Sequence, residues 1–534
     1  MDNNVAESKT PAKKKIRLWP ALLLATLAIG SIVWVKLQEN WPFQARNLAT
    51  AKIVVISVIL LMIWWTFFSR APGRLRLRTT YGLVGCALAF ALLFRLRGMS
   101  GDLAPIFEFR WSRSNVAEQL PATSAPLIMV RSASPATNDF PQFLGPNRDG
   151  VLSGPRLATN WTAQPPALIW QHKVGAGWSG FAVVGNVCLT HEQRGENECV
   201  TAYESASGKS LWVHSDKARY NTVVAGEGPR DTPTVVSNRV YTCGATGLLN
   251  CLDLSTGHRI WFRDLLAGDG KIPDWGVASS PLYVDGMIVV HGGEKARHSL
   301  YAFRADDGQP VWEAGTINPS YASPTLATLA GTRQILAFND GSVSGQDPKT
   351  GAILWEKPWG NGNVECAAPV VINEKQVLFS SGYGVGSELL EISSGTDSKL
   401  AVKILWKSIR MKAKFSHIYA RGGFIYGLDD GIFACVDLKD GSQRWKEGRY
   451  GHGQGLLVGD LYLLMAESGD LVLLHPTPVA ANELARFPVF KAKTWNPIAL
   501  AGNLLLVRND QEAACLRLPV ATLRTVQSRS LSSW

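Results

Sequence analysis

Cysteine and histidine are the residue types in this 534-residue chain that could hold a metal ion or a haem. The chain has 8 cysteines and 9 histidines, but it contains no Cys-x-x-Cys pair, no Cys-x-x-Cys-His haem signature and no His-Glu-x-x-His zinc motif. Cys188 and Cys199 flank a turn-like segment and could face each other across a hairpin, although a reduced pair fits the sequence equally well. These spacings predict neither a metal site nor a haem site.

Three further segments match catalytic or phosphate-binding motifs by letter alone. Lys349-Thr350-Gly351 spells a β-lactamase triplet, but the chain supplies no Ser-x-x-Lys partner motif for it. The segments 382–386 and 451–455 are rich in glycine without the strand, loop and helix spacing that cradles a phosphate. Turns explain all three segments, and we predict no catalytic residue.

Candidate binding residues lie in the segments that join successive strand-rich repeats. These segments are 219–231, 271–275, 359–365 and 412–417. Arg230, Trp275 and Lys414 are the side chains within them that could anchor a partner protein, because large aromatic and cationic residues often dominate interface energetics. Ordinary connections between sheets would account for the same segments, and that alternative stays open.

The positive charge of the chain is confined to its beginning. The formal net charge is +11, and residues 1–98 hold 14 Lys and Arg against 3 acids, which leaves 40 basic and 40 acidic residues in the rest. A nucleic-acid-binding domain needs an excess of basic residues on one face. We therefore predict no nucleic-acid partner.

Residues 1–98 contain three charge-free apolar runs, at 18–35, 53–69 and 79–94. Each run approaches the roughly 20 residues that cross a bilayer, and basic residues at the run ends can extend the span. Lysines and arginines precede the first run and fill the short loop between the second and third, so both should be cytoplasmic. We predict a multi-pass inner (cytoplasmic) membrane protein with a cytoplasmic N-terminus and its large domain on the periplasmic side.

The segment between the membrane region and the large domain, residues 99–139, is mixed in composition and has several prolines. We expect it to be a flexible linker, because it cannot bury enough apolar surface to fold alone. Residues 520–534 are expected to form a C-terminal tail.

A repeat of strand, glycine turn and tryptophan begins near Trp170. In five copies a glycine stands four residues before the tryptophan: Gly208 and Trp212, Gly257 and Trp261, Gly308 and Trp312, Gly351 and Trp355, Gly441 and Trp445. Glycine supplies the positive φ of a tight turn, and Asp253 or Asp347 can hold that turn through local amides. The tryptophan can cover the gap between neighbouring sheets and still reach a hydrogen-bond partner. Sheets of this kind stack around an axis.

The spacing of the aromatic residues predicts the number of sheets. Seven tryptophans and one phenylalanine stand in equivalent places about one repeat apart: Trp170, Trp212, Trp261, Trp312, Trp355, Trp406, Trp445 and Phe487. The last strands, 498–518, lack an outer strand, so residues 167–173 should complete that sheet from the other end. We predict an all-β fold over residues 140–519, an eight-bladed propeller of four-stranded antiparallel blades after three transmembrane helices, with seven blades as the alternative.

The repeat resembles the tryptophan-docking motif of PQQ-like, quinoprotein-type propellers, which is shared with BamB-like proteins of outer-membrane assembly. The lead-in from Phe140 to Gly150 is similar to the segment that opens many PQQ-like repeat proteins. The neutral large domain, the intact structural repeats and the missing active-site motifs predict a non-enzymatic interaction scaffold with envelope-protein partners and no cofactor. The alternative is a membrane-bound quinoprotein dehydrogenase that uses PQQ with Ca²⁺ and passes electrons to quinone, although the vicinal cysteine pair typical of such enzymes is absent.

Overall fold

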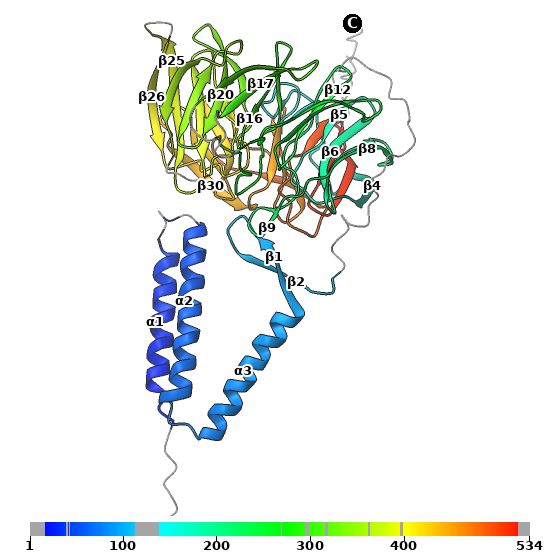
Figure 1. The fold of residues 1–534 in the computed structure, drawn as a ribbon. Coiled ribbons are helices and arrows are strands. Elements are labelled where there is room, and N and C mark those ends of the chain that lie inside the picture. Colours follow the sequence, from blue (N-terminus) through cyan, green and yellow to red (C-terminus); the bar gives the residue numbers. More distant parts are fainter. Residues whose placement is uncertain are drawn as a thin grey trace, which may run out of the picture. The chain divides into compact units, whose positions relative to one another are not determined.

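The structure is a computed structural model, and it describes residues 16–38, 41, 43–112, 138–268, 270–293, 298–315, 319–360, 364–395 and 399–521. The chain divides into two compact units, Met1–Ser112 and Arg113–Trp534. The first unit is helical and the second is built of strands (Figure 1).

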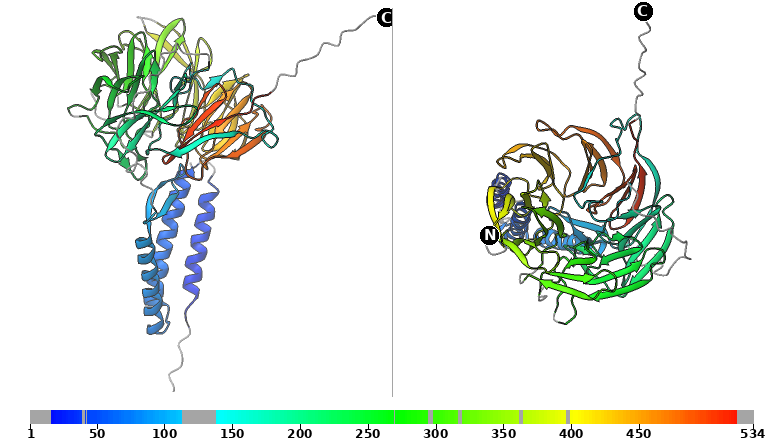
Figure 2. Two further views of the ribbon diagram at one scale, coloured as in Figure 1. Left: turned by 90° about the vertical axis from the view of Figure 1, so that its right-hand side faces the viewer. Right: turned by 90° about the horizontal axis from the view of Figure 1, so that it is seen from above.

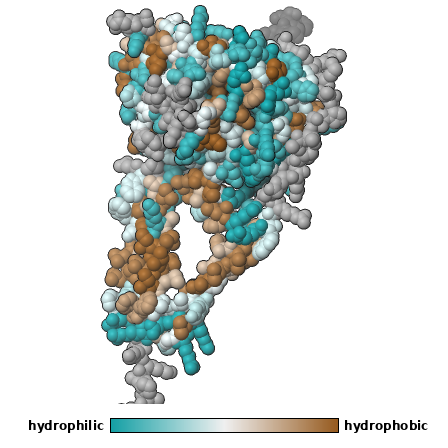
Figure 3. Space-filling model, in the orientation of Figure 1, coloured by the Kyte–Doolittle hydropathy of each residue, from teal (hydrophilic) through white to brown (hydrophobic). Residues whose placement is uncertain are grey.

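The first unit contains α1 (Trp19–Lys36), α2 (Phe43–Ile63) with a π-helical turn that continues it (Trp64–Phe68), and α3 (Gly73–Leu93). The predicted apolar runs are therefore helical, and α2 and α3 begin earlier than the runs do. Residues 19–36 and 43–68 are long and apolar enough to cross a membrane. Apolar side chains cover much of the visible helix surface in Figure 3. The first turns of α3 carry Arg74, Arg76 and Arg78, so a third span remains a prediction.

A two-stranded hairpin follows α3, where we expected the linker to begin. It consists of β1 (Phe94–Met99) and β2 (Pro105–Phe109). Aromatic rings line it, and the centroids of Phe94 and Phe109 are 5.8 Å apart. Cross-strand aromatic pairs stabilise such hairpins, so the linker prediction was wrong for this part of residues 99–139. Residues 113–137 of that linker, and the predicted tail from residue 522, lie outside the described residues.

The second unit is an eight-bladed propeller, as predicted, and Figure 2 shows the blades arranged in a ring. Each blade is a four-stranded antiparallel sheet whose strands follow one another from the inside outward. Blades one to four are β5 (Ala182–Val184), β6 (Val187–Arg194), β7 (Asn197–Glu204), β8 (Ser210–Asp216); β11 (Thr234–Val236), β12 (Arg239–Cys243), β13 (Leu248–Asp253), β14 (Arg259–Asp264); β15 (Leu282–Val284), β16 (Met287–His291), β17 (Leu300–Arg304), β18 (Pro310–Ala314); and β19 (Thr325–Leu329), β20 (Thr332–Asn339), β21 (Ser342–Gln346), β22 (Ile353–Pro358).

Blades five to eight are β23 (Val370–Val371), β24 (Gln376–Ser381), β25 (Gly386–Ser394), β26 (Leu400–Ser408); β27 (Tyr419–Arg421), β28 (Phe424–Asp429), β29 (Ile432–Asp437), β30 (Gln443–Arg449); β31 (Gln454–Val458), β32 (Leu461–Met465), β33 (Asp470–Leu474), β34 (Glu483–Pro488); and β35 (Ala499–Ala501), β36 (Leu504–Arg508), β37 (Glu512–Arg517) with β4 (Ala167–Lys173). A short hairpin, β9 (Asn221–Thr222) and β10 (Gly226–Glu227), lies between blades one and two.

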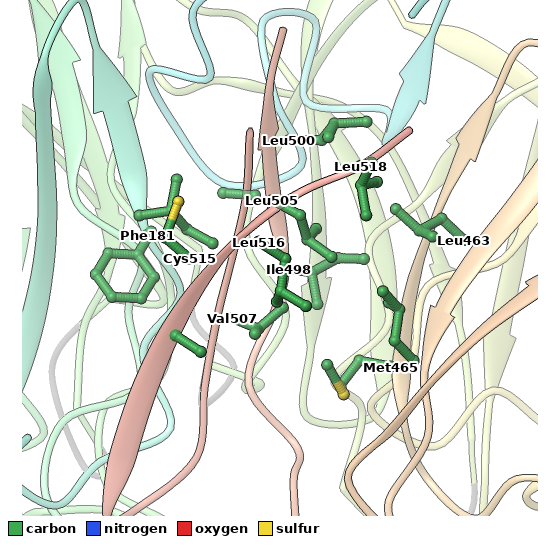
Figure 4. Close-up of a cluster of buried hydrophobic side chains, with 14 of the residues drawn as sticks. Phe181, Leu463, Met465, Ile498, Leu500, Leu505, Val507, Cys515, Leu516 and Leu518 are labelled. Atoms are coloured by element: carbon green, nitrogen blue, oxygen red, sulfur yellow. The ribbon is translucent and has the colours of Figure 1, made fainter. Parts of the chain in front are cut away.

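The two ends of the propeller sequence meet in the eighth blade. β4 pairs antiparallel with β37 and supplies the outer strand, with Trp170 opposite Cys515. This confirms the predicted closure by residues 167–173. Figure 4 shows the apolar core at this closure, where Phe181, Ile498 and Leu516 pack with residues of the seventh blade. Closing the ring in this way removes two free sheet edges.

Six of the seven repeat tryptophans dock onto the next blade through their indole N–H groups. Six indole N–H groups donate to backbone carbonyls of the following blade at 2.8 to 3.0 Å: Trp170 to Ser205, Trp212 to Leu254, Trp261 to Ala305, Trp312 to Pro348, Trp406 to Leu438 and Trp445 to Thr477. Five motif glycines lie directly against the ring of the preceding blade: Gly208, Gly257, Gly308, Gly351 and Gly441. The glycine and the tryptophan of one motif therefore belong to two different interfaces between blades.

The fifth repeat departs from this pattern, as its sequence does. Trp355 of the fourth blade donates instead to the side chain of Gln334 in its own blade, at 2.5 Å. The Asp-Thr turns form where they were expected: Asp347 accepts the amides of Lys349 and Thr350 at 2.8 and 2.9 Å. The Lys-Thr-Gly triplet is thus part of a structural turn.

Cys188 and Cys199 do not face each other. They lie on β6 and β7, and their register partners are Tyr203 and Glu192 respectively. Both are buried free thiols, so the hairpin between them is confirmed but a disulfide across it is not formed.

The lead-in Phe140–Gly150 fills the centre of the ring, and we call this segment the plug. Phe140 exchanges backbone hydrogen bonds with Val183 of the first blade, at 2.9 and 2.7 Å. After the plug, β3 (Val151–Leu152) pairs in parallel with β31 of the seventh blade. The plug therefore contacts blades far apart in the sequence and connects them across the axis.

Candidate functional site: a cup at one mouth of the propeller

The connections from each outer strand to the next inner strand lie at one end of the ring, because the four strands of every blade alternate in direction. A cavity of about 840 Å³, part of it open to solvent, lies where they converge. We call this cavity the cup. It is lined by Phe143, Trp178, Ala225, Arg230, Trp275, Ala278, Ser280, Tyr321, Ser323, Val364, Cys366, Tyr383, Phe415, Gln454, Trp495 and Pro497.

The lining comes from the whole ring. Seven of the eight connections contribute residues to the lining. The connection from β30 to β31 is represented by Gln454, the first residue of β31. Tyr383 comes from the hairpin turn between β24 and β25. This turn is the glycine-rich segment 382–386, so that motif is structural as predicted. Seven of the sixteen lining residues are aromatic, and concave apolar cavities with a few convergent polar groups are the usual form of a binding site.

Hydrogen bonds between neighbouring connections fix the rim. The amide of Gly180 donates to Thr232 Oγ1 at 3.3 Å, the amide of Thr232 to Ser280 Oγ at 2.9 Å, and the amide of Ser280 to Ser323 Oγ at 2.9 Å. Asn496 extends this series to the last blade, because its amide group donates to the carbonyls of Gly177 and Ser179 at 3.0 and 2.8 Å. A rim tied in this way presents a preformed cavity.

The plug forms the floor of the cup. Phe143 faces the cavity, and the Arg148 guanidinium lies 5.9 Å from the centre of its ring. Arg148 is 5% exposed and donates to the carbonyls of Pro281, Ser280 and Pro324 at 2.9, 3.1 and 3.2 Å. Burial lowers the pKa of Arg148 to about 9. Asp139, which directly precedes the plug, accepts the amide of Gly185 in the turn between β5 and β6, at 3.0 Å.

Arg230 reaches the wall of the cup from the connection between β8 and β11. Its guanidinium donates to the carbonyls of Gly228, Ala225 and Gly226 at 2.5, 2.6 and 3.4 Å, and it lies 4.8 Å from the centre of the Tyr220 ring. No carboxylate of the described residues lies within 4.0 Å of it. Burial lowers the pKa of Arg230 to about 10, so it is still a cation at neutral pH.

The structure brings the three predicted partner-binding residues together. Arg230 and Trp275 both line the cup. Lys414 lies beside it, with Nζ 4.9 Å from the centre of the Tyr383 ring and 5.8 Å from that of Phe415. Lys414 is only 3% exposed, so it is placed within the wall rather than on an outer surface. That any of the three contacts a partner remains a prediction.

Sequence reasoning missed a second cationic and aromatic group on the rim. Lys493 Nζ lies 3.7 Å from the centre of the Trp495 ring and 4.6 Å from that of Trp178. These residues lie in the connections on either side of the eighth blade. They could have been found by looking for aromatic and cationic residues in the segment after Phe487, as was done for the segment that contains Arg230.

Glu365 lies between the lining residues Val364 and Cys366. It is 2% exposed. Burial, with Asp340 adding to the effect, raises the pKa of Glu365 to about 8. Burial also raises the pKa of the neighbouring Cys366 thiol to about 12, so this thiol is protonated at neutral pH and is not an activated nucleophile.

Comparison with known proteins agrees with this architecture. Residues 154–447, more than half of the chain, match the family model described as outer membrane protein assembly factor BamB. The chain belongs to the BamB family. It is 26% identical over 310 residues to the outer membrane protein assembly factor BamB of Moranella endobia, a match that covers 54% of this chain and 73% of the relative. It is 24% identical over 266 residues to BamB of Shewanella oneidensis, covering 46% of this chain and 60% of that relative.

Solved structures show the same fold beyond the BamB family. The quinohemoprotein alcohol dehydrogenase ADHIIG of Pseudomonas putida HK5 superposes with a TM-score of 0.54 and 12% identity, covering 72% of this chain and 81% of that one. At this identity the likeness concerns the propeller alone.

The residues of the cup do not match the quinoprotein site that the resemblance implied as an alternative. Calcium needs several oxygen ligands, usually including carboxylates, and the lining contains no Asp or Glu. Among the described residues, no group of three or more His, Cys, Asp and Glu is placed to hold a metal ion. No chemical step through PQQ or Ca²⁺ follows from this residue set.

Proposed function

We propose that this BamB-family chain is a membrane-anchored interaction scaffold of the cell envelope, and that partner proteins dock at the mouth of its propeller. The observation that carries the proposal is the preformed cup, to which connections from the whole ring contribute aromatic and cationic side chains. Its relatives are named outer membrane protein assembly factors. A rigid mouth lined with tryptophan, tyrosine and arginine has the composition of an interface centre.

The proposal assigns three spans, α1, α2 and α3, to the bilayer, because an odd number of spans places the propeller on the side opposite the N-terminus. The length and composition of α1 and α2 support spanning. The basic residues of the N-terminal segment support a cytoplasmic N-terminus, which puts the propeller on the extracytoplasmic side. Fusions at the C-terminus test this topology. Alkaline phosphatase should be active there and green fluorescent protein should be dark, and the reverse result would move the propeller to the cytoplasm.

Site-specific photocrosslinking tests the docking surface. A photoreactive residue at Trp275 should capture defined envelope proteins in intact membranes, whereas the same residue at Ile260, which is 45% exposed on the outer strand β14, should not. Equal capture at the two positions would argue against docking at the mouth.

Our proposal includes no resident cofactor, and the lack of a carboxylate in the lining supports this. Purified protein should be titrated with PQQ and Ca²⁺ and followed by absorbance and by dye reduction with alcohols and sugars. Stoichiometric uptake with turnover would contradict the scaffold and favour a dehydrogenase.

A further inference from the structure

Arg230 has hydrogen-bonding capacity that the protein itself does not use. A guanidinium has five N–H groups, and three hydrogen bonds to backbone carbonyls are made by Arg230. Two N–H groups remain, on a side chain that lines the cup. Within the described part of the chain no carboxylate pairs with it: the buried Glu198 is engaged by the Ala245 amide and the Thr246 hydroxyl, at 3.0 and 3.1 Å.

The charge of the cup favours an anion. Arg230 lies in the wall of the cup, and the lining offers no acidic side chain against this cation. Charged hydrogen bonds inside a largely apolar cavity are stronger than those on a wet surface, so a carboxylate is the complementary group.

The aromatic walls favour an apolar group next to that carboxylate. Trp275 packs against the cluster of Tyr220, Ala225 and Ala245, which holds it at the wall beside Arg230. Trp495 and Phe415 continue the aromatic surface, with ring centroids 4.9 Å apart. Such rings bind apolar or aromatic side chains well, because they offer large rigid surfaces at little cost in conformational entropy.

We propose that the cup binds an acidic peptide segment of a partner protein, with a carboxylate on Arg230 and an adjoining apolar or aromatic side chain against Trp275 and Trp495. The cup opens to solvent, which lets a chain segment enter and leave, and Phe143 of the plug lines it. The inference rests on the proposed scaffold function and adds to it the chemical class of the partner.

The test uses the full chain in detergent micelles and two labelled peptides. The first is a fluorescein-labelled peptide of glutamates around one tryptophan, and the second replaces every glutamate with glutamine. Fluorescence anisotropy should show binding of the first peptide at least about tenfold tighter than the second, since hydrogen bonds to charged groups exceed those to neutral groups by that order.

Three variants locate the binding. Arg230→Gln should lower the affinity for the acidic peptide at least about tenfold and leave the affinity for the glutamine peptide unchanged. Arg219→Gln is the matched control, because Arg219 lies in the same connection but pairs with Glu196 and Glu227 outside the lining, and it should have no effect. Ala278→Trp fills the cup without changing its charge and should abolish binding, which keeps the proposal testable if Arg230→Gln does not fold.

Several results would overturn the inference. These are equal affinity for the two peptides, equal loss in the Arg219 and Arg230 variants, full binding by Ala278→Trp, or no binding of the acidic peptide up to about 1 mM. Binding of indole-3-acetate alone, with no peptide bound, would make the cup a small-molecule site and would also overturn it. If the crosslinked envelope partners are still captured by Arg230→Gln, the scaffold stands and only the peptide assignment fails.

Discussion

At the scale of single residues, the docking of glycine against tryptophan limits what each motif can tolerate. Gly308 has a φ of +68°, and a Cβ added there would lie 2.6 Å from the indole of Trp261. Gly331 has a similar φ of +73° with nothing within 4 Å of its Cβ position. A side chain at either position would strain the backbone, but only a side chain at Gly308 would also collide with the tryptophan of the neighbouring blade.

Gly308→Ala should lower the free energy of unfolding by several kcal/mol, because the new methyl group displaces the indole as well as straining the backbone. Gly331→Ala should cost only about 1 kcal/mol, the strain of a left-handed alanine. Thermal unfolding of both variants measures the difference. Equal melting temperatures would mean that the contact between blades contributes nothing.

Glu365 gives the mouth a pH dependence of stability. Burial raises the pKa of this carboxyl to about 8 in the folded protein, from its ordinary value of 4.5. Between these two pH values the Glu365 carboxyl is therefore ionised only in the unfolded state. The contribution of the Glu365 carboxyl to the free energy of unfolding is fully present below about pH 4.5 and is lost as the pH rises toward about 8. Glu365→Gln stays neutral and should lose less melting temperature than the wild type between about pH 6 and pH 9, by several degrees.

The control for this prediction is Glu374→Gln, since Glu374 is exposed and should leave the pH profile of the wild type unchanged. Identical pH profiles for wild type and Glu365→Gln would mean that the Glu365 carboxyl is solvated in the folded protein.

At the scale of elements, the seam between the last blade and the first depends on one buried side chain. Arg508 on β36 is fully buried and donates to Thr190 Oγ1 and to the carbonyls of His191 and Gly175, at 2.7, 3.1 and 2.7 Å. It also lies near the buried Glu192: burial alone would raise the pKa of Glu192, but Arg194 and Arg508 outweigh it and lower that pKa to about 2. Strand pairing and this arginine hold the seam together.

Arg508→Met should destabilise the propeller by about 3–5 kcal/mol, because it removes the Arg508 donor from acceptors in the first blade and in the connection before it, and removes a charge that compensates Glu192. Limited proteolysis should then cut near the seam first. Arg517→Met, at an exposed position of β37, is the control and should unfold like the wild type. A seam variant as resistant as the control would contradict this role of Arg508.

The sequence predicts these elements where a repeat signals them. The closure by Ala167–Lys173 could be predicted because the aromatic at Trp170 keeps the repeat spacing while the last strands lack an outer partner. The hairpin at Phe94–Phe109 was missed, because it lies next to a proline-rich segment and has no repeat to mark it. The residues that form a turn are close together in the sequence and can be recognised there, whereas an isolated hairpin depends on contacts that only the fold supplies.

At the scale of the whole molecule, the sequence placed Arg230 and Trp275 in connections, but not around a common cavity. Their convergence follows from closing the ring, which brings connections from distant repeats to one mouth. The burial of Lys414 depends on its packing against Gly382 and Tyr383 of a neighbouring turn. Neither effect is visible in the spacing of residues along the chain.

The plug is the feature that links the whole ring, and its sequence has no repeat that could have revealed this. Arg148 donates hydrogen bonds to carbonyls just before the inner strands of the third and fourth blades. Arg148→Leu should therefore speed hydrogen exchange in residues 278–284 and 320–327, by the equivalent of about 2–4 kcal/mol of lost protection, while outer strands keep theirs. Mass spectrometry of peptides from the exchanged full chain measures this.

Arg156→Leu provides the comparison for the plug, because Arg156 is an exposed residue shortly after it and should leave exchange unchanged. If Arg148→Leu also exchanges like the wild type, the floor of the cup is held by Phe140 and β3 alone. If protection is lost in every blade at once, the ring unfolds as a single unit and the plug stabilises all of it rather than the mouth. Selective loss at the two inner strands is the result that the three Arg148 hydrogen bonds require.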